Sequence, residues 1–170
     1  MCIRDSFWAA RTGNLAQVKK LVAAGVDVNA AENEINLKPI LLASRDHQWE
    51  VVNYLLDRGA QADPVSTRTG DSPLRSAVLD GPTDLVRRLL EKGADPLRLP
   101  YTSCVPDATP IHWAASQGST DKLELLIKAV RRKGGDLEGI REGLYERALS
   151  DPKINYYETV KVLILSLIHI

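Results

Sequence analysis

The stretch TPIHWAASQG, residues 109–118, contains the features that decide the fold. Thr109 and Pro110 suit the start of a helix, because proline fits the first helical turn and a threonine hydroxyl can cap it. Ala114, one turn further on, allows close approach between neighbouring helices. Gly118 can adopt the left-handed backbone conformation that ends a helix. The stretch therefore predicts a short helix with a defined start and end.

The same pattern recurs along the chain, in the blocks FWAARTGN, ILLASRDH, LRSAVLDG and IHWAASQG. The aligned alanines, 34, 34 and 37 residues apart, are Ala9, Ala43, Ala77 and Ala114. A second apolar segment in each unit has the i, i+3, i+4, i+7 spacing of an amphipathic helix. It ends at a glycine that recurs at intervals of 34 residues, as Gly25, Gly59 and Gly93. Each unit is therefore predicted to be a helix, a turn, a second helix and an extended turn.

These units resemble the ankyrin repeat family, whose TPLHxA signature and period of about 33 residues are matched best by Thr109, Pro110, Ile111, His112 and Ala114. The resemblance implies an all-α solenoid of stacked helix-turn-helix units with extended turn or hairpin connections. It covers the interior of the chain, residues 7–164, as units 7–30, 31–64, 65–97, 98–137 and a degenerate, truncated 138–164. Lys38 departs from the signature threonine, and Leu41 and Arg75 from the signature histidine.

The resemblance also implies roles for individual residues. His112 is expected to hydrogen-bond across the turn, with Thr109 as its partner, and to tie adjacent units together. Because no second catalytic group recurs near it in the sequence, a structural role is favoured over a ligand or acid/base role. Ser72 and Thr109 are expected to cap helices through their hydroxyls. The predicted ends of the first helices, as left-handed residues, are Gly13, His47, Gly81 and Gly118.

Three tryptophans and one basic run have structural interpretations that we favour. Trp8 and Trp113 occupy the same position in two units, and stacking of the units is expected to bury both. Trp49, on a second helix, is expected in the core. The run of Arg131, Arg132 and Lys133 precedes a glycine pair, and a helix C-terminus favours cations at such a place. A targeting or anion-binding patch is the alternative for this run.

Composition excludes several classes of protein. The 170 residues are 44% hydrophobic and 26% charged, which is typical of a globular chain. With 22 basic and 22 acidic residues, the net charge draws the chain neither to nucleic acid nor to a membrane. Cys2 and Cys104 form no paired motif, which argues against structural zinc or a disulfide framework and favours a reducing, cytoplasmic location. The short HExxH, GxSxG and GxxxxGK[ST] motifs are absent, so we expect neither an enzyme nor a cofactor or metal.

The two ends of the chain have an unusual relation to each other. Residues 1–6, MCIRDS, and residues 165–170, LSLIHI, can each be back-translated to a DNA string. The string for MCIRDS is contained in the reverse complement of the string for LSLIHI. That string resembles the transposon mosaic end used to prepare sequencing libraries. We expect both segments to be translated adapter, residues 7–164 to be a fragment, and the true N-terminus to be missing. The apolar stretch 160–170 contains a lysine and is too short to span a membrane.

A stacked array presents a curved surface whose exposed positions vary without disturbing the repeat. The resemblance therefore implies a non-catalytic protein-protein interaction scaffold, monomeric as an array, that binds a protein partner through its turn tips and the concave helix face. The alternative is a regulatory or targeting segment of a larger enzyme whose catalytic domain lies outside this fragment. Carried over by register, the candidate partner-binding residues are Arg11, Thr12, Ile35, Leu37, Arg45, Asp46, Arg68, Thr69, Asp71, Leu79, Asp80, Tyr101, Val105, Ser116 and Gln117.

Overall fold

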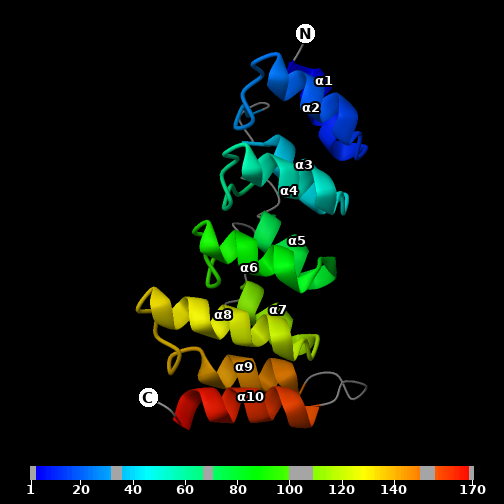
Figure 1. The fold of residues 1–170 in the computed structure, drawn as a ribbon. Coiled ribbons are helices and arrows are strands. Elements are labelled where there is room, and N and C mark those ends of the chain that lie inside the picture. Colours follow the sequence, from blue (N-terminus) through cyan, green and yellow to red (C-terminus); the bar gives the residue numbers. More distant parts are fainter. Residues whose placement is uncertain (1–2, 32–35, 67–70, 100–108, 150–155, 169–170) are drawn as a thin grey trace.

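A computed structural model describes residues 3–31, 36–66, 71–99, 109–149 and 156–168. In these ranges the chain forms helix pairs stacked one on another (Figure 1). The helices are α1 (Ile3–Arg11), α2 (Leu15–Ala23), α3 (Pro39–Arg45), α4 (Trp49–Asp57), α5 (Pro73–Asp80), α6 (Thr83–Glu91), α7 (Pro110–Ser116), α8 (Thr120–Arg132), α9 (Arg141–Ala148) and α10 (Tyr156–Ile168). Successive pairs from α1–α2 to α9–α10 are called units one to five below. The predicted all-α solenoid is confirmed.

The first helices of the units form one layer, in which α1, α3, α5, α7 and α9 contact each other in sequence. Alanine makes this close packing possible, because its side chain adds little bulk between two helices. The recurring alanines are fully buried, with no exposed surface at Ala9, Ala43, Ala77 and Ala114. The second helices form the other layer and bury leucines and valines between the layers. In unit three these residues are Leu85, Val86, Leu89 and Leu90.

The first helices begin at the prolines that the sequence marks, since α3, α5 and α7 each have proline in their first turn. Ser72 caps α5 as predicted, because its hydroxyl accepts a hydrogen bond from the Arg75 N–H at 3.2 Å. The predicted cap by the Thr109 hydroxyl is wrong. That oxygen lies 2.7 Å from Nδ1 of His112 instead, which is the expected contact between those two residues.

Glycines in the left-handed conformation end the second helices of the first three units, with φ of +85°, +86° and +97° at Gly25, Gly59 and Gly93. The short turns of three units also contain a left-handed residue as predicted, at Gly13, His47 and Gly118. Gly81 does not follow the prediction, because its φ is −89°. It precedes Pro82, and a residue before proline is restricted to extended conformations. Glycine fits there for another reason, since a Cβ would lie 2.7 Å from the Ala77 Cα.

The tryptophans differ from the sequence-based expectation. Trp8 is 62% exposed, so the prediction that stacking buries it is wrong. Trp113 is half-buried, and the Arg75 guanidinium of the preceding unit lies over its ring, 5.7 Å from the centroid. Among the described residues no unit precedes the first one, so no side chain equivalent to Arg75 lies over the Trp8 ring. Trp49 is half-buried at the edge of the core rather than inside it.

Polar contacts join neighbouring units across the second-helix layer. Arg88 of α6 donates to Asn53 and Asp57 of α4. The basic run at the end of α8 acts similarly, because Lys133 donates to the Gly93 and Ala94 carbonyl oxygens at 3.0 Å. Arg131 and Arg132 lie in the last turn of α8, where the prediction places cations, but the carbonyl oxygens that Arg132 and Lys133 contact are at the end of α6 in the preceding unit.

We predict that His112→Ala lowers the free energy of unfolding by about 2–4 kcal/mol, because it empties a buried site and removes the contact with Thr109. His112 is only 2% exposed. Thr109→Val is the matched control, which keeps the volume but removes the hydroxyl and is expected to cost about 1 kcal/mol. Urea denaturation measures both values. An unchanged unfolding midpoint for His112→Ala would contradict a structural role for the ring.

We also predict different costs for alanine at two glycines. Gly59→Ala is expected to cost about 1 kcal/mol, because its positive φ disfavours a Cβ although nothing lies within 4 Å of that position. Gly81→Ala is expected to cost more, because the new Cβ meets the Ala77 backbone and cannot be relieved by a rotamer change. Denaturation midpoints compare the two variants. Equal costs, or a smaller cost at Gly81, would show that the close approach to Ala77 is unimportant.

Candidate functional site

The candidate partner-binding residues fall on two opposite sides of the stack. Figure 1 shows the short turns within the units on one side and the longer connections between units on the other. On the side of the longer connections, Leu37 and Asp71 are described by the structure. The candidates that lie outside the described residues are Ile35, Arg68, Thr69, Tyr101 and Val105.

The described candidates in the longer connections are partly covered. Leu37 is half-buried, so it does not stand as an open apolar tip. Asp71 is also half-buried, and its carboxylate Oδ1 forms an ion pair with Arg75 Nη1 at 2.6 Å. The Asp71 carbonyl oxygen accepts a hydrogen bond from the Ser66 N–H at 3.1 Å. Asp71 therefore helps to hold its own connection in place.

The other eight candidates lie together along one side of the stack, which we call the short-turn edge. It consists of Arg11, Thr12, Arg45, Asp46, Leu79, Asp80, Ser116 and Gln117. Contacts between units make this edge continuous. Arg11 Nε lies 3.2 Å from Asp46 Oδ2 in the next unit, and Gln117 donates to the Leu79 carbonyl oxygen at 3.0 Å. The structure thus brings together residues that are far apart in the sequence.

His47 belongs to the same edge, although the sequence analysis assigned it only a backbone role. Its Nε2 lies 3.6 Å from Asp80 Oδ2 of the following unit. Its ring is stacked on Trp49, with centroids 5.3 Å apart and planes inclined by 11°. The positive φ at His47 places the side chain where it joins units two and three. The turn register indicated the backbone conformation, but not this contact.

The first part of the edge has a positive character. The Asp46 carboxylate is shared by two guanidiniums, since Arg45 Nε lies 3.7 Å from its second oxygen. The side chains of Arg11 and Arg45 remain 63% and 43% exposed. Trp8 lies one helical turn before Arg11 on α1 and adds an exposed aromatic ring. A cationic corner beside an aromatic ring can bind both carboxylates and apolar side chains.

Unit three contributes one acidic residue, Asp80, to the edge. The Asp80 side chain is 55% exposed and lies close to α8 of the following unit. Lys122 of α8 donates to the carbonyl oxygens of Val78 and Ala77, at 2.7 and 3.2 Å. Burial lowers the pKa of Lys122, and the negative charge of Asp80 opposes that shift. Asp80 therefore lies between His47 of unit two and Lys122 of unit four.

Two other kinds of site are absent from the part of the chain that the structure describes. There, no group of three or more histidine, cysteine, aspartate or glutamate side chains could hold a metal ion. Nor does any described helix have both the length and the apolar character needed to cross a bilayer. The described contacts of the short-turn edge are ion pairs, hydrogen bonds and a ring stack within the chain.

Sequence comparisons agree with this geometry. A family model described as ankyrin repeats (3 copies) matches residues 6–99, and a second, ankyrin repeats (many copies), matches residues 74–127. Palmitoyltransferase Hip14 of Drosophila melanogaster is 32% identical over 92 residues, which cover 54% of this chain and 14% of that protein. Palmitoyltransferase AKR1 of Lachancea kluyveri is 32% identical over 123 residues, covering 71% and 16%.

A third relative has a different name. Ankyrin repeat and KH domain-containing protein mask-1 of Caenorhabditis elegans is 28% identical over 122 residues, covering 71% of this chain and 4% of that protein. The chain therefore spans less than a fifth of the length of each of these three relatives. The registered helix pairs and the match over more than half of the sequence lead to one conclusion. The chain belongs to the ankyrin repeat family.

Proposed function

We propose that this ankyrin array binds a protein partner through the short-turn edge and the adjoining ends of the first helices, without catalysing a reaction. Ankyrin repeats generally mediate contacts between proteins, and side-chain contacts connect successive units along this edge. A surface that is already ordered loses less conformational entropy on binding than a flexible one does. The edge therefore suits recognition of a partner of defined shape.

The observation that carries the proposal is the corner formed by Trp8, Arg11 and Arg45. All three side chains are exposed, while the residues beneath them, such as Ala9 and Ala43, are fully buried. Tryptophan and arginine are the residue types most enriched among strong interface contacts. Their side chains are thus available to a partner without loosening the core of the stack.

The longer connections are proposed as a second row of partner contacts. Its residues are Ile35, Leu37, Arg68, Thr69, Asp71, Tyr101 and Val105. The half-buried Leu37 and Asp71 support a smaller contribution than the short-turn edge makes. We also propose that the array works as a monomer and without a cofactor. A reducing cytoplasmic setting is proposed because Cys2 and Cys104 form no paired motif.

A second candidate function is regulation or targeting of an enzyme to which the array is joined. Two relatives are named palmitoyltransferases, and the similarity covers at most 16% of their lengths. In that case this segment would still act by binding, and any chemistry would belong to another part of the protein. A long sequencing read of the source nucleic acid across both ends separates the candidates. A catalytic domain in the same frame supports the second, and further repeats support the first.

We predict that a photo-crosslinking amino acid at position 8 captures a protein partner in an extract of the source cells. The same amino acid in place of Lys20, which is exposed in the last turn of α2 and far along that helix from the short turn, is the control and should capture no such protein. Mass spectrometry identifies the adduct. Capture from position 20 alone would contradict binding at the short-turn edge.

The captured partner then allows a quantitative test with Arg45→Glu. Charge reversal at the cationic corner is expected to weaken binding by about tenfold or more, because a glutamate at position 45 cannot pair with a carboxylate of the partner. The melting temperature should change little, since the side chain is exposed. Lys20→Glu, a charge reversal of the same sign at an exposed residue in the last turn of α2, is the matched control. An affinity unaffected by Arg45→Glu would exclude the corner from the interface.

A further inference from the structure

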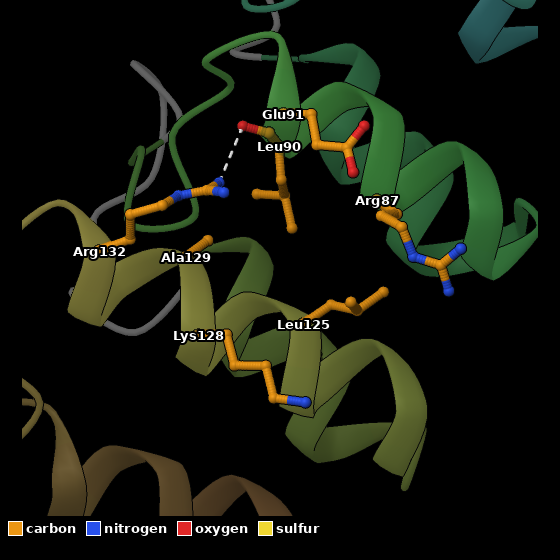
Figure 2. Close-up of a pocket in the computed structure, with 7 residues that line it drawn as sticks. All are labelled: Arg87, Leu90, Glu91, Leu125, Lys128, Ala129 and Arg132. Carbon is orange, nitrogen blue, oxygen red and sulfur yellow. Dashed lines mark hydrogen bonds between the residues drawn. The ribbon is translucent and has the colours of Figure 1, made fainter.

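A cavity of about 280 Å³ lies between α6 and α8, in the layer of second helices (Figure 2). We call it the α6–α8 groove. Its floor is apolar and consists of Leu90, Leu125 and Ala129, which project into the space between the two helices. Its rim contains the basic residues Arg87, Lys128 and Arg132. The volume is several times the roughly 30 Å³ share of one water molecule, so the groove has room for a side chain.

The repeat register explains why the groove occurs at this place. Arg88 and Leu125 occupy equivalent positions, seven residues after Gly81 and Gly118. In unit three, Arg88 reaches back to Asn53 and Asp57 and bridges α4 to α6. In unit four, Leu125 is too short and too apolar to make the same bridge to α6. The groove is therefore the space that a bridging side chain occupies one unit earlier.

The residues that such a bridge would reach in α6 are Arg87 and Glu91, the register equivalents of Asn53 and Asp57. Arg87 instead pairs with Asp84 of its own helix at 2.8 Å. Unit two offers a comparison, because its residue at the bridging position, Tyr54, has Lys19 of the preceding unit over its ring at 5.7 Å. In units two and three a side chain thus joins the helices here, whereas Leu125 is only half-buried.

The rim has an excess of positive charge. Arg87 and Lys128 are 51% and 72% exposed, and their pairs with Asp84 and Glu124 are surface pairs that solvent and salt weaken. Arg132 donates to the Leu90 carbonyl oxygen at 3.4 Å, as the dashed line in Figure 2 shows. Because that acceptor is neutral, the contact leaves the guanidinium charge in place. Glu91 is the one carboxylate among the residues that line the groove.

We propose that the α6–α8 groove is a second docking site, which takes an acidic segment of a protein partner carrying one apolar side chain. The apolar side chain lies on Leu90, Leu125 and Ala129, and carboxylates on either side of it pair with Arg87, Lys128 and Arg132. Burial of the apolar side chain supplies affinity, and the three cations select an acidic segment. This site lies in the second-helix layer, separate from the short-turn edge, and does not depend on binding there.

The test titrates the full chain with a blocked pentapeptide, one tryptophan flanked on each side by two glutamates. Amide NMR shifts are followed along the chain. We expect shifts that saturate at Leu125, Ala129 and nearby residues of α6, with the short-turn edge unaffected. Two control peptides carry glutamine for glutamate or alanine for tryptophan. Each should bind at least about tenfold more weakly, because the first lacks the negative charges and the second lacks the large apolar side chain.

Leu125→Arg is the decisive variant, because it restores the residue type that bridges α4 and α6 one unit earlier. The new guanidinium is expected to fill the groove and pair with Glu91, so that peptide binding is lost while the melting temperature is kept or raised. Leu125→Met is the matched control, which keeps an apolar side chain of similar volume and should bind the peptide as the unaltered chain does. The retained melting temperature shows that any loss of binding is not a loss of folding.

Several outcomes would overturn the proposal. These are no shifts around Leu125 at millimolar peptide, unchanged binding by Leu125→Arg, or equal binding of the glutamine peptide. Inorganic phosphate or a single-stranded oligonucleotide is added at matched ionic strength as a further probe. If either reproduces the shifts of the acidic peptide, the groove attracts anions in general, and the assignment of an acidic protein segment is wrong. The result at this groove does not test the proposal for the short-turn edge, since the two sites share no residue.

Discussion

The structure depends on the packing of each unit against the next. A single helix pair cannot bury its apolar face alone, so each unit is stabilised by its neighbours. The alanines of the first helices and the leucines of the second helices supply these contacts, and residues such as Ala43, Ala77 and Leu89 have no exposed surface. Because apolar residues fix the fold, residues on the turns and outer faces are free to serve recognition. The short-turn edge and the rim of the α6–α8 groove consist of such residues, whereas the floor of the groove includes the core residues Leu90 and Ala129.

Polar contacts between units determine where those surfaces differ. Along the short-turn edge, the pairs of Arg11 with Asp46 and of His47 with Asp80 order the turns. In the second-helix layer, Arg88 bridges two units, whereas the equivalent Leu125 leaves a groove. The same repeat position is thus a structural contact in one unit and part of a proposed docking site in another. Differences between units, rather than the shared pattern, give the array its individual surface.

The sequence predicts most of the fold, because the apolar spacing, the prolines and glycines such as Gly59 act locally. Prediction from the sequence fails where a neighbouring residue determines the backbone conformation, the hydrogen bond or the exposure of a side chain. Gly81 is extended because Pro82 follows it, and the Thr109 hydroxyl contacts His112 instead of capping α7. Trp8 and Trp113 share a register position but differ in exposure, since only Trp113 has a preceding described unit. The short-turn edge could be located by register, but its contacts between units and the α6–α8 groove required three-dimensional positions.

The central claim is that a partner binds residues of the short-turn edge without disturbing the packed core. Hydrogen exchange of the chain, with and without a partner recovered by crosslinking, tests this claim most directly. The account predicts slower exchange in the turns around Arg11 and Asp46 when the partner is bound, with exchange in the buried middle of α4 unchanged. Slower exchange elsewhere in the chain, with these two turns unaffected, would contradict it.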